Sequence, residues 1–148
     1  MIIKKIDDKD RYMNLFLLAD PSEKVIKKYI NDSQMYGIIV DNKVVSQVLV
    51  TKVDDDTCEL KNISTLDEYK GNGYASKLIE YIFNVYKNKY TRMIVGTTEN
   101  MIPFYVLNGF TKYYSTIKNF FLDNYDQEIW DGNMQCIDMY YYSKEFKK

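Results

Sequence analysis

The 148-residue sequence contains no histidine. This absence excludes catalysis by Ser–His or Cys–His pairs and any metal site built on imidazole ligands. Proton transfer must therefore use carboxyl groups, tyrosine, lysine, cysteine or water. Only two cysteines occur, Cys58 and Cys136, which are too few for a disulfide framework and fit no metal-binding spacing. We expect both to be inert buried thiols and expect no bound metal.

The sequence also lacks a long apolar run and an excess of either charge. No stretch approaches the roughly 20 apolar residues that a membrane span needs, and the first residues lack the order of a signal peptide. We therefore expect a cytoplasmic protein with no membrane partner. The formal net charge is −1 and the pI is about 5.5, which argues against a nucleic-acid-binding groove. A hydrophobic content of 46% predicts one domain over residues 1–148.

What the sequence does contain is a succession of strand-like and helix-like patterns. Strands are expected at residues 2–6, 36–40, 44–53, 57–66, 92–97, 111–117 and 136–142. Helices are expected at residues 7–19, from 20–23 onward to Ile30, from 75 to 86 and at 102–107. The segment 119–135 has no clear period and is expected to be irregular. This order predicts a mixed α/β domain with mostly antiparallel strands and one helical crossover.

The stretch Gly71-Asn72-Gly73 allows two interpretations. Asn-Gly is a strong signal for a two-residue hairpin turn. The apolar residues that follow instead recur every three or four positions, which favours a helix starting after Gly73; they are Ala75, Leu78, Ile79, Ile82, Val85 and Tyr86. Glycines before a helix N-terminus leave main-chain amides open to an anion, most naturally a phosphate. On geometry alone, a phosphate site and a purely structural loop remain equally open.

Lys70-Gly71-Asn72-Gly73-Tyr74-Ala75 resembles the acyl-CoA signature Q/R-x-x-G-x-G/A of the GNAT acetyltransferases. The resemblance implies the GNAT fold, a mixed and mostly antiparallel sheet of six to seven strands flanked by about four helices. It also implies that the loop holds the pyrophosphate of coenzyme A through main-chain amides. Lys70 stands where the family usually has Gln or Arg, so the charge is kept but bidentate geometry is lost.

Two further segments carry the same resemblance. Cys58–Ile63 resembles the strand before the loop, and Glu59 stands where some members have a glutamate acting as general base. The segment 104–110 resembles Y-x-x-x-G-F, in which the tyrosine, here Tyr105, commonly protonates the departing thiolate. The non-catalytic alternatives are that Glu59 faces solvent or pairs with Lys61, and that Tyr105 is a core aromatic.

The resemblance implies acetyl-CoA as the co-substrate and a primary amine as the acceptor, joined by direct attack in a ternary complex. The cofactor contacts that it implies are Ser64, Thr65, Leu66, Lys70, Gly71, Asn72, Gly73, Tyr74, Ala75, Ser76 and Asn100, the last of which could equally be a helix N-cap. A non-catalytic acyl-CoA-binding domain on the same fold is the alternative function. A homodimer through an exposed strand or the aromatic tail is also left open.

The segment from Phe120 to Asp131 is rich in aromatic and acidic residues. If it folds over the cleft, its carboxylates would attract a cationic amine and two aromatics would wall the pocket; these are Asp123, Asp126, Glu128 and Asp131, with Tyr125 and Trp130. A solvated loop anchored by its aromatics is the equally weighted alternative. Asp20-Pro21-Ser22 and the tail resemble one bacterial branch of small GNAT proteins, which says little about the substrate.

Overall fold

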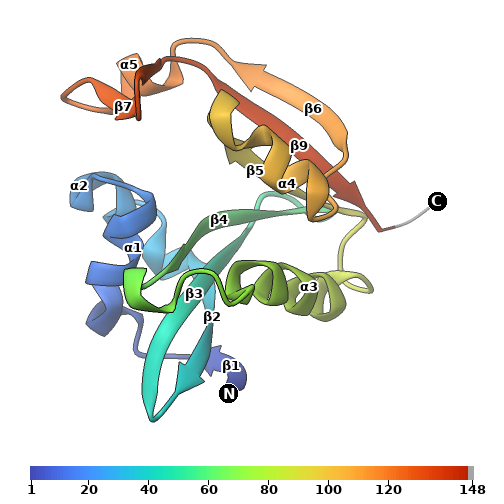
Figure 1. Cartoon of the computed structure of the whole chain (residues 1–148). Coiled ribbons are helices and arrows are strands. Elements are labelled where there is room, and N and C mark those ends of the chain that lie inside the picture. Colours follow the sequence, from blue (N-terminus) through green and yellow to red (C-terminus); the bar gives the residue numbers. More distant parts are fainter. Residues whose placement is uncertain (147–148) are drawn as a thin grey trace.

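The computed structural model describes residues 1–146, which form the helices and strands shown in Figure 1. The strands are β1 (Ile2–Ile6), β2 (Ser33–Val40), β3 (Lys43–Lys52), β4 (Thr57–Thr65), β5 (Arg92–Thr97), β6 (Lys112–Ile117), β7 (Ile129–Asp131), β8 (Met134–Cys136) and β9 (Met139–Glu145). The α-helices are α1 (Met13–Ala19), α2 (Glu23–Lys27), α3 (Tyr74–Tyr86), α4 (Ile102–Leu107) and α5 (Phe120–Asn124). Short 3₁₀ helices occupy Lys9–Tyr12, Ile30–Asp32, Asp67–Tyr69 and Glu99–Met101. Within residues 1–146, no helix combines the length and the apolar character that a bilayer crossing requires.

Seven strands form the main sheet, in the order β1-β2-β3-β4-β5-β9-β6. Neighbouring strands are antiparallel except β4 and β5, which run parallel and are joined through α3. This arrangement confirms the predicted fold class of a mixed, mostly antiparallel sheet with one helical crossover. The short strands β7 and β8 form a separate ribbon, and α5 lies beside it, opposite α1 and α2 (Figure 1).

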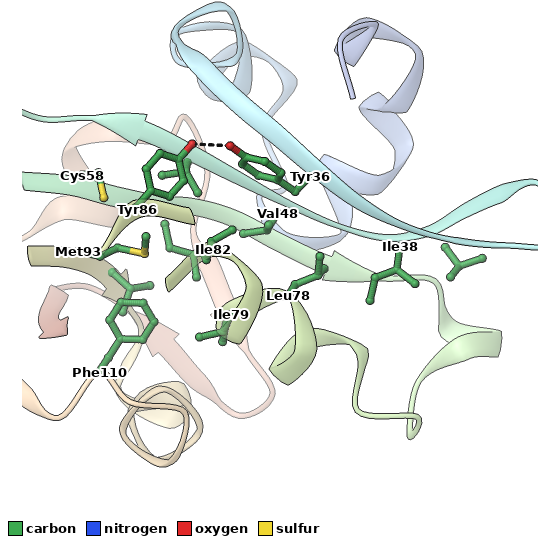
Figure 2. Close-up of a cluster of buried hydrophobic side chains, with 14 residues drawn as sticks. Tyr36, Ile38, Val48, Cys58, Leu78, Ile79, Ile82, Tyr86, Met93 and Phe110 are labelled. Carbon is green, nitrogen blue, oxygen red and sulfur yellow. Dashed lines mark hydrogen bonds between the residues drawn. The ribbon is translucent and has the colours of Figure 1, made fainter. Parts of the chain in front are cut away.

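The core lies on both faces of the first four strands because their side chains alternate in direction. On β2, Tyr36 and Ile38 face α3, whereas Met35 packs with Phe16 of α1 on the opposite face. Figure 2 shows the cluster under α3, where the hydroxyls of Tyr36 and Tyr86 lie 2.9 Å apart in a hydrogen bond. The strands are therefore held between α3 on one face and the α1–α2 pair on the other.

Helix α3 follows the predicted amphipathic pattern. Its side chains buried against the sheet are Leu78, Ile79, Ile82 and Tyr86. Asp41 and Asn42 join β2 to β3 in a two-residue hairpin turn, and both have the positive φ that a primed turn requires. The helix at residues 102–107 forms as predicted.

Two predictions near the C-terminus are wrong. The segment 119–135 is not irregular throughout, because it contains α5 and the β7–β8 ribbon. The strand predicted at 136–142 is instead divided into β8 and β9 at Ile137 and Asp138. At this break the Phe121 amide donates to Ile137 O and the Asn119 amide donates to Asp138 Oδ1, so these groups hold the start of α5 and are not part of a sheet ladder.

Candidate active site

The parallel pair β4–β5 separates at the carboxyl ends of its strands. The paired residues reach only Leu60 and Val95, although β4 continues to Thr65 and β5 to Thr97. A cleft of about 830 Å³ lies at this separation, lined by residues of β4, β5, α3 and α4 and by the segments around α1 and α5. The carboxyl ends of parallel strands are where ligands of open α/β sheets commonly bind.

A β-bulge in β4 alters which side chains face each side of the sheet. Val50 pairs with Leu60 and Leu49 with Asn62, so Lys61 is the extra residue. Leu60 belongs to the core under α3, whereas Asn62 donates to a main-chain carbonyl of α1 on the opposite face. Lys61 and Asn62 both line the cleft as a result.

The predicted phosphate loop lies at one end of this cleft. Gly71 and Gly73 have φ values of +84° and +76°, which other residues rarely adopt, and a Cβ on either would meet no protein atom within 4 Å. The first main-chain bond of α3 runs from the Lys77 amide to Gly73 O. Within the described residues, no protein acceptor is assigned to the amides from 73 to 76. The loop therefore presents free donors and open space.

The other predicted loop residues divide into two groups. Lys70, Tyr74, Ala75 and Ser76 line the cleft. The Lys70 ammonium is 3.0 Å from Asp67 and its side chain is 65% exposed, so it is a solvent-exposed, paired charge at the rim. The Asn72 side chain donates to the carbonyl of Tyr69 and stabilises the loop from outside the cleft lining. Its predicted cofactor contact is thus left to its main-chain amide.

The three residues predicted at the end of the preceding strand have their own protein partners. The Ser64 hydroxyl donates to a carbonyl of α1, and the Thr65 hydroxyl shares a 2.8 Å hydrogen bond with Ser46; both residues line the cleft. Leu66 lies outside the lining, and its amide donates to Val45 O at 2.8 Å. This bond disfavours the predicted cofactor contact through the Leu66 amide.

Tyr105 on α4 lines the cleft on the same face of the sheet as α3. Its ring contacts Phe104 and Phe110 edge-on, which fixes its position. Within residues 1–146 its hydroxyl has no assigned hydrogen-bond partner, in contrast to the paired hydroxyls of Tyr36 and Tyr86. Burial raises the pKa of Tyr105 to about 12, so the hydroxyl keeps its proton near neutral pH.

Glu59 lies on β4, two residues before the bulge, and its side chain is only 12% exposed. Burial raises its pKa, while the Lys61 ammonium, 3.6 Å away, opposes that rise. The Lys61 pairing that the sequence suggested as an alternative is therefore present. Glu59 is not itself part of the cleft lining, so a base at this position would reach the cleft through water.

A polar network on the α1–α2 side was not predicted from the sequence. Asp20 lines the cleft and accepts hydrogen bonds from the Tyr29 hydroxyl at 2.8 Å and the Tyr125 hydroxyl at 3.0 Å. Asn62 donates to the Tyr29 hydroxyl and accepts from the buried amide of Gln47. Asn62 gave no distinct signal because β4 contains polar residues along most of its length, and the Asp20–Tyr125 contact spans 105 residues, which no local pattern records.

The acidic segment contributes to the cleft less than its composition suggested. Asp131 lines the cleft, as do Tyr125 and Trp130. The other three carboxylates lie outside the lining: Asp126 pairs with Lys24, Glu128 accepts from the Trp130 indole, and Asp123 is exposed on α5. The segment is therefore neither a simple solvated loop nor a uniformly acidic wall.

Asn100 is exposed and lies outside the cleft lining. Its side-chain amide donates to the Asp131 carbonyl at 3.3 Å, which connects the 3₁₀ helix after β5 to the β7–β8 ribbon. It is not an N-cap, since Thr98 holds that position without a side-chain bond. The structure thus gives Asn100 a bridging role, and its cofactor contact stays a prediction.

Both cysteines are buried and free, as expected. Cys58 belongs to the core under α3, where burial raises its pKa to about 12. Cys136 lines the far part of the cleft, and burial raises its pKa too. Neither thiol has the lowered pKa of a nucleophile.

Three comparisons with known proteins bear on the family and the fold of this chain. The family model described as acetyltransferase (GNAT) domain matches residues 31–112. The uncharacterized N-acetyltransferase YvbK of Bacillus subtilis is 26% identical over 134 residues, covering 88% of this chain and 86% of that protein.

Two solved structures superpose over nearly the whole chain. A GNAT family acetyltransferase from Elizabethkingia anophelis, with acetyl-CoA bound, is 28% identical with a TM-score of 0.87 and covers 97% of both chains. The IAA acetyltransferase from Bacillus cereus is 24% identical, also with a TM-score of 0.87, over 97% of this chain and 98% of that one.

Proposed function

Since this chain belongs to the GNAT acetyltransferases, we propose that it transfers the acetyl group of acetyl-CoA to a primary amine. The acceptor amine belongs to a small molecule, a peptide or a protein. The observation that carries this function is the shared cleft: the loop amides from 73 to 76 and the hydroxyl of Tyr105 open onto the same space, and none of them has an assigned protein partner among residues 1–146.

The loop has the properties that a diphosphate requires. The amides from 73 to 76 stand at the positive end of the α3 dipole, and Gly71 and Gly73 leave room for close approach. Lys70 adds a positive charge at the rim. The bound acetyl-CoA of the Elizabethkingia relative supports the same co-substrate here.

The part of β4 beyond Leu60 suits the pantetheine arm and the thioester. Its ladder with β5 ends at Leu60, so on that side the main chain of residues 61–65 is free to bond a ligand. Acetyl-CoA supplies an activated acyl thioester. Main-chain amides of this strand would hold the thioester carbonyl and stabilise the negative charge that develops on its oxygen.

Glu59 and Tyr105 would then handle the two protons of the transfer. As the amine nitrogen bonds to the carbonyl carbon, Glu59 accepts the amine proton through water, which fits its place beside the cleft and its raised pKa. As the carbon–sulfur bond breaks, Tyr105 donates its proton to the sulfur. The products are an amide and a free thiol, and no covalent enzyme intermediate is formed.

The function is tested by thiol release from acetyl-CoA over a panel of polyamines, amino acids, aminoglycosides and peptide N-termini. Tyr105→Phe is expected to lower kcat with the best amine about 10²- to 10⁴-fold, the usual range for an acid catalyst, while the Kd of CoA stays within threefold. Tyr142→Phe is the matched control, because Tyr142 is also packed edge-on against aromatics but lies outside the cleft. Equal rates for the two variants would refute the role of Tyr105.

A non-catalytic acyl-CoA-binding domain is the second candidate, favoured by one observation: Glu59 lies outside the cleft lining and its carboxylate is paired with Lys61. The same panel separates the two functions. Tight CoA binding without thiol release from any amine would favour the binding domain.

A further inference from the structure

The contacts around Asp20 assign a recognition role to the half of the cleft that faces α1 and α2. Resting on the proposed function, we propose that Asp20 binds the ammonium group of the acceptor as it enters the cleft, and that this acceptor is an amine with an apolar, aromatic-sized body. The bound ammonium loses one proton to solvent water before the neutral nitrogen attacks the thioester. Asp20 would thus select the substrate class, whereas Glu59 and Tyr105 act in the transfer itself.

The Asp20 carboxylate is held in a fixed position. It accepts from the Tyr29 hydroxyl, the Tyr125 hydroxyl and the Ser22 amide, at 2.8, 3.0 and 3.2 Å. A carboxylate offers about four acceptor sites, so one remains for a ligand. Both tyrosines have pKa values raised above the ordinary range, mainly by burial, and their hydroxyls therefore keep their protons and remain donors to Asp20.

No protein cation is paired with Asp20 within residues 1–146. Two lysines on this side of the sheet have other partners: Lys61 pairs with Glu59 and lies over the Tyr29 ring, and Lys24 pairs with Asp126. Asp131 is a second carboxylate in the lining. This half of the cleft therefore favours a positive ligand group.

The walls beside Asp20 are apolar and open to solvent. Trp130, Leu18 and Leu17 line the cleft although 54%, 52% and 37% of their surfaces are exposed. The Tyr125 ring stacks on Phe121 at 5.7 Å between centroids, which gives this side a flat aromatic surface. Exposed apolar groups around the fixed Asp20 carboxylate match a ligand with one cationic end and a hydrophobic body, and the aromatic faces also attract cations.

A purely structural role for Asp20 must be separated from recognition, because the residue caps α1 and ties it to Tyr125. The two roles are distinguished by whether the protein prefers a cationic ligand over a neutral one. Loss of a structural contact would weaken all ligands alike, whereas loss of a recognition charge removes the preference for a cation over a neutral molecule of the same shape.

The experiment measures binding without turnover, using phenethylamine, its neutral analogue 2-phenylethanol, and propylamine, which lacks the ring. Trp130 is the chain's one tryptophan, so its fluorescence reports ligands on this side of the cleft. Titrations are made with and without CoA, on the wild type, Asp20→Asn and Asp126→Asn. Asp126 is the matched control because it carries the same charge, is 85% exposed and lies outside the lining.

In the wild type and in Asp126→Asn, phenethylamine is expected to bind at least tenfold more tightly than either of the other two probes, the size of a charge-assisted hydrogen bond or of a buried ring. In Asp20→Asn the preference over 2-phenylethanol should disappear. Equal binding of phenethylamine and 2-phenylethanol by the wild type would overturn the inference even if Asp20→Asn fails to fold. The inference would also be overturned if folded Asp20→Asn kept the preference for phenethylamine over 2-phenylethanol, if the wild type bound propylamine as tightly as phenethylamine, or if it bound none of the probes.

Failure of the proposed function gives a different result. If Asp20-dependent binding of phenethylamine is found but no amine yields free thiol, recognition stands and catalysis is refuted. If thiol is released from amines with the same amine KM in the wild type and Asp20→Asn, catalysis stands and the role of Asp20 is refuted.

Discussion

Gly73→Leu tests the cofactor loop most directly. Gly73 has a φ of +76°, and a leucine there is strained by roughly 1–2 kcal/mol. A ΔΔG of 1 kcal/mol lowers Tm by about 2–4 °C in a protein of this size, so a decrease of about 2–8 °C is expected. Since nothing in the protein lies within 4 Å of the added Cβ, no steric clash adds to this cost.

The same substitution should affect CoA binding far more than stability. The leucine side chain would project from a residue that lines the cleft and keep a diphosphate away from the amides that begin α3. Each charge-assisted hydrogen bond lost costs about 1.5–3 kcal/mol, which corresponds to about tenfold to hundredfold in Kd. Calorimetric titration with CoA measures the loss, and thermal denaturation measures the strain.

Gly132→Leu provides the control for strain. Gly132 has a φ of +60°, has open space around its Cβ position and lies in the turn between β7 and β8, outside the cleft lining. Its variant should show a similar decrease in Tm with unchanged CoA affinity. If Gly73→Leu binds CoA as tightly as the wild type, the amides of this loop do not hold the diphosphate and the cofactor half of the proposal fails.

Three further predictions concern charge and thiol chemistry. Glu59 acts as a base only when deprotonated, and burial raises its pKa, so kcat at saturating amine should fall as the pH decreases through that raised value. In Glu59→Gln this fall of kcat at low pH should disappear. If the fall persists in the variant, another group is responsible for it. Lys70→Ala should weaken CoA binding less than about fivefold, because the exposed ammonium is already paired with Asp67. The loss should be smaller at 0.5 M salt than at 0.05 M salt. A hundredfold loss of CoA affinity in titrations would contradict this prediction. Cys58→Ala should release the CoA thiol from acetyl-CoA at the wild-type rate, because the Cys58 thiol is buried with a pKa near 12. An inactive but folded variant would refute the inert role of Cys58.

The C-terminal third illustrates why part of the fold could not be predicted. Strand β9 lies between β5 and β6, so the last strand in sequence occupies an interior position of the sheet. Short elements such as α5 have too few residues for a periodic signal. Asp138 lies between β8 and β9, and its carboxylate accepts a hydrogen bond from the distant Asn119 amide. These features depend on partners that a local pattern does not record.

The site shows the same division. The loop from Gly71 to Gly73 could be predicted because its chemistry depends on neighbouring residues: positive φ, small side chains and the start of a periodic helix. The position of Glu59 relative to the cleft could not be predicted, because it depends on the bulge at Lys61. That bulge arises from the register between β3 and β4 and leaves no pattern in the sequence of either strand.

The available chemistry can be read from the residues alone: carboxyl, phenol and amide groups with no imidazole, and a glycine loop leading into an amphipathic helix. Such properties follow from residue type and from contacts within a few positions along the chain. Which groups share a cleft depends on the three-dimensional fold, which brings Asp20 to Tyr125 and places Tyr105 in the same cleft as the loop before α3. The reason is that these meetings depend on strand order and register, which are set by packing between distant segments.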